Sequence, residues 1–160
     1  MEATEAINNL EMVLRDLIAD VLGEEFGTDW IAKCGTSEKV QRWHDRQEEE
    51  AKKRDGTVVE GRLIYFADFT DLLPIVKKHW HLFKPCLGDR QTFTTYMGRL
   101  EDFRNAPMHS RALVDFEQQL IQGMAGEIRN KVTLYQTGAN AASPLSANRV
   151  RPRLIRPCYK

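Results

Sequence analysis

The sequence predicts an all-α protein, and three observations support this fold class. Apolar residues recur every three or four positions through most of the chain, which is the spacing of one face of an α-helix. No stretch shows the alternation of apolar and polar residues that is typical of a β-strand. No internal repeat or glycine-rich phosphate loop is present. We therefore expect a bundle of four or five helices over residues 1–137 and a flexible basic tail over residues 138–160.

The length and composition suit one globular domain. The 160 residues, 42% of them hydrophobic and 29% charged, are enough to bury a core without a metal ion or a disulfide bond. The 23 basic and 23 acidic residues balance, which excludes a uniformly basic surface for nucleic acid. Three widely separated cysteines, Cys34, Cys86 and Cys158, indicate neither a disulfide framework nor a zinc site. We expect a cytoplasmic protein with no membrane-spanning segment, no metal and no cofactor.

The first predicted helix starts at Thr4, whose hydroxyl can cap it, and stops at Gly23. Its apolar positions follow helical spacing: Ile7, Leu10, Leu14, Leu17, Ile18 and Val21. Up to Asp29 the chain holds eight acidic residues and one basic residue, Arg15. This acidic segment and the basic tail, which contains four arginines and one lysine, are candidate docking elements for a regulatory protein.

A second helix is predicted from a cap at Thr36 or Ser37 to Arg54. Few of its residues are apolar, so its charged outer face is expected to be solvated. Asp55 and Gly56 then form a turn signal.

The most hydrophobic segment, Leu63 to Phe83, predicts a core helix that starts near Asp68. Pro74 lies six residues past that start, so it either kinks the helix or moves the first turn to about Thr70 or Asp71. Pro85 and Gly88 are expected to end this helix.

Two more helices complete the predicted bundle. One has an apolar face formed by Phe93, Tyr96, Met97, Leu100 and Phe103, and Pro107 interrupts the pattern after it. The last helix is predicted from about Met108 to Tyr135, with these residues facing inward: Leu113, Phe116, Leu120, Ile121, Met124, Ile128 and Val132.

The joint between these last two helices contains the residues best suited to catalysis or to anion binding. Arg104 and Asn105 are expected at the end of one helix, because the residue before Pro107 is pushed out of helical geometry. His109 then lies near the start of the next helix, where free amides attract an anion and keep the imidazole neutral. Such a histidine can act as a general base, and Arg104 can bind a phosphate. Alternatively, both side chains only cap carbonyls or pair with nearby acids such as Glu101 and Asp102.

This pattern resembles the signature of the HEPN superfamily. The signature is an arginine and a histidine separated by four to six residues, often with a polar residue directly after the arginine. The matching residues here are Arg104, Asn105 and His109, with four residues between the arginine and the histidine. The likeness extends over about Ala6 to Tyr135. It includes the helical order, the late position of the motif and an aromatic helix like Leu63 to Phe83, as in the bacterial branch. The resemblance implies a HEPN-like helical bundle.

The resemblance also implies a metal-independent endoribonuclease. Active members of the family cut RNA by attack of the 2′-hydroxyl, which leaves a 2′,3′-cyclic phosphate and a 5′-hydroxyl. They act as homodimers with a composite site, so His109 from one chain would be the base and His109 from the other the acid. Arg104 would clamp the phosphate, and Asn105 would orient the arginine or the substrate. Ser110 and Arg111 follow the motif and are candidates for substrate contacts, unless Arg111 is simply solvated. The setting is often a toxin or an antiviral defence factor restrained by an antitoxin or another regulatory protein.

Two alternative functions remain open. A noncatalytic module of the same fold would dimerise or bind RNA, and it is favoured if Arg104 pairs with a buried acid and His109 is covered. Convergence of two such arginines and histidines in one open cleft favours the enzyme. A helix-turn-helix regulator is the weakest alternative, because the last helix carries Asp115, Glu117 and Glu127 where a basic recognition face would be needed.

Overall fold

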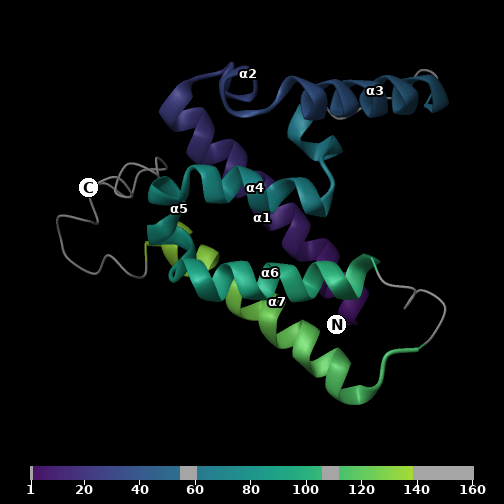
Figure 1. Ribbon diagram of the computed structural model, residues 1–160, viewed down its shortest axis with the longest axis vertical. Helices are drawn as coiled ribbons and strands as arrows, with labels where there is room; N and C mark the ends of the chain where they lie inside the picture. Colours follow the sequence, from purple (N-terminus) through teal and green to yellow (C-terminus); the bar gives the residue numbers. More distant parts are fainter. Residues whose placement is uncertain (1, 55–60, 106–111, 139–160) are drawn as a thin grey trace.

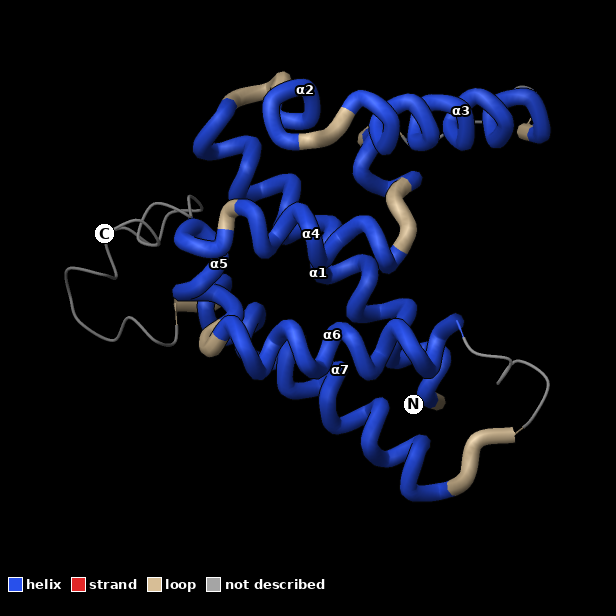
Figure 2. The backbone as a smooth tube through the Cα atoms, in the orientation of Figure 1, coloured by secondary structure: helices blue, strands red, loops and turns tan. Residues whose placement is uncertain are grey.

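The computed structural model describes residues 2–54, 61–105 and 112–138 (Figure 1). Within these ranges the chain forms helices and no strand, which confirms the all-α fold class (Figure 2). The same ranges contain seven α-helices and one 3₁₀ helix, rather than the four or five helices expected. The predicted basic tail over residues 138–160 lies outside the described residues, apart from Gly138.

The first helix, α1 (Ala3–Phe26), is longer at both ends than its sequence pattern predicted. The Thr4 cap was wrong, because the backbone N–H of Ala3 already donates to the side-chain oxygen of Gln118 at 3.1 Å. The stop at Gly23 was also wrong, since the helix continues to Gly27, whose φ of 90° suits a residue without a Cβ. Gly23 lies inside the helix, facing the ring of Trp30.

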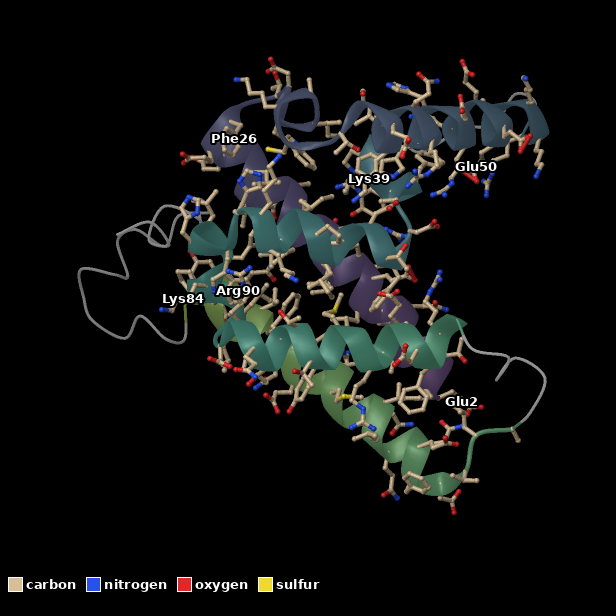
Figure 3. The ribbon with its side chains drawn as sticks, viewed as in Figure 1. Glu2, Phe26, Lys39, Glu50, Lys84 and Arg90 are labelled. Atoms are coloured by element: carbon tan, nitrogen blue, oxygen red, sulfur yellow. The ribbon has the colours of Figure 1, made fainter. Side chains whose placement is uncertain are left out.

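A short helix, α2 (Trp30–Cys34), separates α1 from α3 (Ser37–Lys53). The predicted cap of α3 is confirmed at Thr36, whose hydroxyl oxygen accepts a hydrogen bond from the N–H of Lys39 at 3.3 Å. Trp43 is the one buried side chain of this helix. Accordingly α3 extends away from the other helices (Figure 3), and charged side chains such as Glu38, Glu48 and Glu49 are exposed on it.

The hydrophobic segment expected to form one core helix is divided into three elements: η1 (Leu63–Phe66), α4 (Phe69–Lys78) and α5 (Trp80–Leu87). Helix α4 does start beside Asp68, as predicted, and it accommodates Pro74 in its interior. The division at His79 was not predicted, and the backbone of this residue leaves helical geometry with a ψ of 36°. Pro85 lies inside α5, which ends at Gly88 as expected.

The last two described helices are α6 (Arg90–Asn105) and α7 (Asp115–Gln136). The predicted inward face of α6 is confirmed, since Phe93, Met97 and Leu100 are buried. The predicted start of α7 near Met108 was wrong, because Val114 is extended and its N–H donates to the carboxylate of Glu117 at 3.1 Å. Phe116 consequently lies in the exposed first turn, with 69% of its surface accessible, instead of facing inward.

Helix α1 forms the centre of the molecule and packs along α7, with α2, α4, α6 and η1 also against it. Its apolar face is almost completely buried, as are the inner faces of α4, α5, α6 and α7. Two charged side chains, Glu11 and Asp71, are also buried among the residues described. No helix in the described part of the chain is both long enough and apolar enough to cross a bilayer.

Candidate functional site

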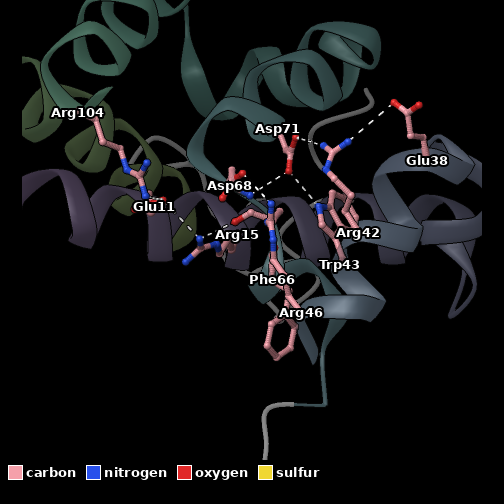
Figure 4. Close-up of polar contacts among 11 residues, drawn as sticks. Glu11, Arg15, Glu38, Arg42, Trp43, Arg46, Phe66, Asp68, Asp71 and Arg104 are labelled. Carbon is pink, nitrogen blue, oxygen red and sulfur yellow. Dashed lines mark hydrogen bonds and ion pairs between the residues drawn. The ribbon is translucent and has the colours of Figure 1, made fainter. Parts of the chain in front are cut away.

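Arg104 lies in the last turn of α6 and is the first residue of the predicted motif, which ends at His109. Its side chain is 36% exposed, and its Nη2 atom lies 3.5 Å from Oε2 of Glu11 on α1 (Figure 4). The acid that the structure places against Arg104 therefore comes from the first helix rather than from the neighbouring Glu101 and Asp102. This contact joins the end of α6 to the middle of α1.

The same carboxylate oxygen also serves a second arginine. Nη2 of Arg15, one turn along α1, lies 3.4 Å from Oε2 of Glu11 and donates to the carbonyl oxygen of Ala67 at 2.7 Å. We call Glu11, Arg15 and Arg104 the Glu11 cluster. Only 6% of the Glu11 side chain and 15% of the Arg15 side chain are exposed, so both charges are held largely out of water.

Burial lowers the pKa of Arg15, Glu11 acts in the opposite direction by raising it, and the nearby charge of Arg104 lowers it again. A guanidinium nevertheless stays protonated in proteins. The cluster therefore contains two positive charges and one negative charge. Asp68 adds a further negative charge near Arg15 and, like Glu11, raises its pKa. Of the three side chains in the cluster, Arg104 is the most exposed.

A second polar cluster lies where α3 meets α4, and it fixes α3 to the body (Figure 4). The buried carboxylate of Asp71 accepts hydrogen bonds from Nε1 of Trp43 at 3.0 Å, from Nη2 of Arg42 at 3.2 Å and from the N–H of Asp68 at 3.0 Å. Burial alone would raise the pKa of Asp71, but the hydrogen bonds from Trp43 and the Asp68 amide, with the charge of Arg42, lower it overall. Arg46 adds bonds to Asp68 and to the carbonyl of Phe66.

Of the site residues predicted from the sequence, the structure shows the side chain of Arg104 only. Asn105 is the last residue of α6. His109, Ser110 and Arg111 fall in residues 106–111 and lie outside the described residues. The predicted meeting of Arg104 with His109 is therefore untested.

Sequence reasoning missed Glu11 and Arg15 as neighbours of Arg104. A signal for Glu11 was present, because it lies on the same helical stripe as Ile7 and Leu14, which are buried. A charged residue on an apolar stripe needs a partner of opposite charge. Its second partner, Arg104, comes from another helix, which the local pattern does not reveal.

Comparison with family models, with curated proteins and with solved structures finds no match to this chain. The resemblance to the HEPN superfamily therefore rests on Arg104, Asn105 and His109 and on the order of helices around them. Within the described residues, histidine, cysteine and acidic side chains form no group of three that could hold a metal ion.

Proposed function

We propose that this chain is a metal-independent endoribonuclease of the HEPN kind. The observation that supports it best is the position of Arg104: it lies at the end of α6 as the first residue of the predicted motif, and it remains one-third exposed beside Arg15. The two guanidinium groups of the Glu11 cluster suit the phosphate backbone of RNA, because arginine binds phosphate through several parallel hydrogen bonds.

The proposed reaction needs no group beyond the side chains of two chains. His109 accepts the proton of the 2′-hydroxyl, whose oxygen forms a bond to the adjacent phosphorus. Arg104 stabilises the charge on the pentacoordinate phosphorus, and Asn105 orients the phosphate. The bond from phosphorus to the 5′-oxygen breaks as the partner subunit's His109 donates a proton to that oxygen. The products are a 2′,3′-cyclic phosphate and a 5′-hydroxyl.

A homodimer follows from this assignment, because a two-fold axis brings the same surface of each chain together. Each chain then supplies one histidine to a composite site, and Ser110 and Arg111 add contacts to the RNA. The proposed setting is a cytoplasmic toxin or antiviral defence factor under the control of an antitoxin or another regulatory protein.

The contact between Arg104 and Glu11 supports a second candidate function. A buried acid against Arg104 is one of the two features expected of a noncatalytic module, the other being a covered His109. In that case the Glu11 cluster anchors α6 to α1, and the protein serves to dimerise or to bind RNA without cutting it.

Cleavage of RNA in excess chelator by wild-type protein and by a His109→Ala variant distinguishes the two functions. The enzyme predicts a loss of rate on the order of 100- to 10,000-fold in the variant, because a general base or acid is removed. His44→Ala is the matched control, since His44 is exposed on α3 and should leave the rate unchanged. A folded wild-type protein that binds RNA and does not cut it supports the noncatalytic module instead.

A further inference from the structure

The Glu11 cluster places two guanidinium groups against one oxygen atom of one carboxylate. Nη2 of Arg15 and Nη2 of Arg104 lie 3.4 Å and 3.5 Å from the same Oε2 of Glu11 (Figure 4). Both distances exceed the roughly 2.7–2.9 Å typical of a strong charge-assisted hydrogen bond. Glu11 therefore offers one negative charge to two guanidinium groups, and Asp68 is a more distant negative charge near Arg15.

Arg15 is held in place by contacts that leave part of its hydrogen-bonding capacity unused. Nη2 donates to the carbonyl of Ala67 at 2.7 Å, which joins the guanidinium to the residue that follows η1. Nη1 has a weak contact of 4.0 Å with the sulfur of Met12, a side chain that is 47% exposed. Nε of Arg15 is buried and has no hydrogen-bond partner among the described residues. An arginine oriented in this way loses little conformational entropy when it binds an anion.

We propose that Arg15 and Arg104 together bind a phosphate group of the RNA strand and that Glu11 is the internal anion with which this phosphate competes. The inference deepens the proposed function and rests on it. It assigns Arg15 and Glu11 to the substrate site, although they lie far from the motif in the sequence. A phosphate offers several acceptor oxygens where Glu11 offers one shared oxygen, so the phosphate can satisfy both guanidinium groups at once.

The first test is the affinity of Glu11→Gln for a short single-stranded 2′-O-methyl RNA, which cannot be cut by 2′-hydroxyl attack. Removal of the competing charge should tighten binding by at least about fivefold at low salt, the factor for one unit charge near a phosphate in bulk water, because Glu11 is largely buried. Loss of folding would weaken binding, so it cannot imitate this result.

Asp16→Asn is the matched control for Glu11→Gln. It makes the same charge change one turn further along α1, where Asp16 is half-exposed and pairs with Arg62 at 3.6 Å. Its affinity should stay within about twofold of wild type, because Asp16 is half-exposed to water and is paired with Arg62 rather than with Arg15 or Arg104. Equal tightening in both variants would show a general charge effect and overturn the inference, as would unchanged or weaker binding by a folded Glu11→Gln variant.

Arg15→Gln tests the second arginine through the salt dependence of binding. The slope of log K against log salt should become shallower by about 0.7, the value for one phosphate contact on a single strand. An unchanged slope and affinity in a folded Arg15→Gln variant would contradict a phosphate contact at this residue.

Thermal unfolding with inorganic pyrophosphate separates this inference from the proposed function. The two arginines of Glu11→Gln lack their shared counterion, so pyrophosphate should raise the Tm of this variant more than that of wild type or Asp16→Asn. Equal shifts in all three proteins would overturn the anion site.

If wild type binds RNA and Glu11→Gln does not alter that affinity, only the inference fails. If no variant binds RNA, the proposed function fails, and a pyrophosphate shift specific to Glu11→Gln would still establish the anion site.

Discussion

Glu11 and Asp71 show how individual acidic residues hold helices together in this protein. Each lies on the buried side of its helix and is paired with arginine side chains from another element, Arg104 for Glu11 and Arg42 for Asp71. A buried carboxylate without such partners would be costly, because it loses its hydration. The two acids therefore make the contacts of α1 with α6 and of α4 with α3 specific.

Replacement of Asp71 by Asn should lower the free energy of unfolding by about 2 kcal/mol at neutral pH, because charge-assisted hydrogen bonds to a buried group are lost. The pKa of Asp71 is lowered in the folded state, so its contribution is present above the unfolded pKa and is lost as the pH falls through the folded pKa. Urea denaturation at pH 7 and pH 3 should show the difference from wild type shrinking in acid.

Asp45→Asn is the control for Asp71→Asn, since Asp45 is exposed on α3 and accepts one hydrogen bond from Gln41 at 3.0 Å. It should change stability by less than about 0.5 kcal/mol. A loss as small as this in Asp71→Asn would mean that the buried hydrogen bonds add little to the attachment of α3.

His79 should make stability depend on pH in the range where histidine titrates. Burial lowers its pKa, the charges of Lys78 and His81 lower it further, and its Nε2 is buried with no hydrogen-bond partner among the described residues. The unfolded chain therefore binds the proton more readily, so stability is highest above about pH 6.5 and falls as the pH drops below that value. Denaturation of wild type and His79→Phe between pH 5 and pH 8 measures this effect.

His79→Phe retains a ring against Phe26, whose centroid lies 5.4 Å from that of His79, and it removes the titrating group. The variant should lose part of the pH dependence, whereas His44→Gln on the exposed face of α3 should retain all of it. Identical pH profiles for wild type and His79→Phe would contradict a lowered pKa of His79 in the folded protein.

At the scale of the helices, the sequence pattern predicted those elements that depend on local signals. The cap of α3 at Thr36 and the buried face of α6 follow from a hydroxyl and from helical spacing, and both are confirmed. The predicted start of α1 was wrong because the N–H of Ala3 donates to Gln118 of α7, a residue that lies beside Ala3 only in the folded protein. The start of α7 was wrong because a capping contact between Val114 and Glu117 competes with a longer apolar pattern.

Two glycines, one at a helix end and one inside a helix, test the assigned backbone conformations. Gly88 ends α5 with a φ of 87°, and a Cβ there would lie 3.2 Å from Nζ of Lys131. Gly88→Ala should therefore cost about 1 kcal/mol of stability, because the left-handed conformation is strained for other residues. Gly98 lies inside α6, where a Cβ meets no atom within 4 Å, so Gly98→Ala should stabilise by about 0.5 kcal/mol. Thermal or urea denaturation measures both, and changes of the same sign would contradict the assigned conformations.

At the scale of the whole molecule, the candidate site depends on how the helices assemble. The sequence predicted Arg104 at the end of a helix, and the structure agrees. It did not predict Glu11 or Arg15, because α1 and α6 are far apart in the chain and meet only in the folded bundle. The pairing of two copies about a two-fold axis involves contacts between chains. It stays a prediction, as does the role of His109.

The chemical identity of the RNA ends is the most direct test of the proposed endoribonuclease. Wild-type protein in excess chelator should produce fragments with a 5′-hydroxyl and a 2′,3′-cyclic phosphate. A phosphatase should remove this phosphate only after acid opens the ring. Fragments with 5′-phosphate and 3′-hydroxyl ends, or no fragments from a folded protein that binds RNA, would contradict the account.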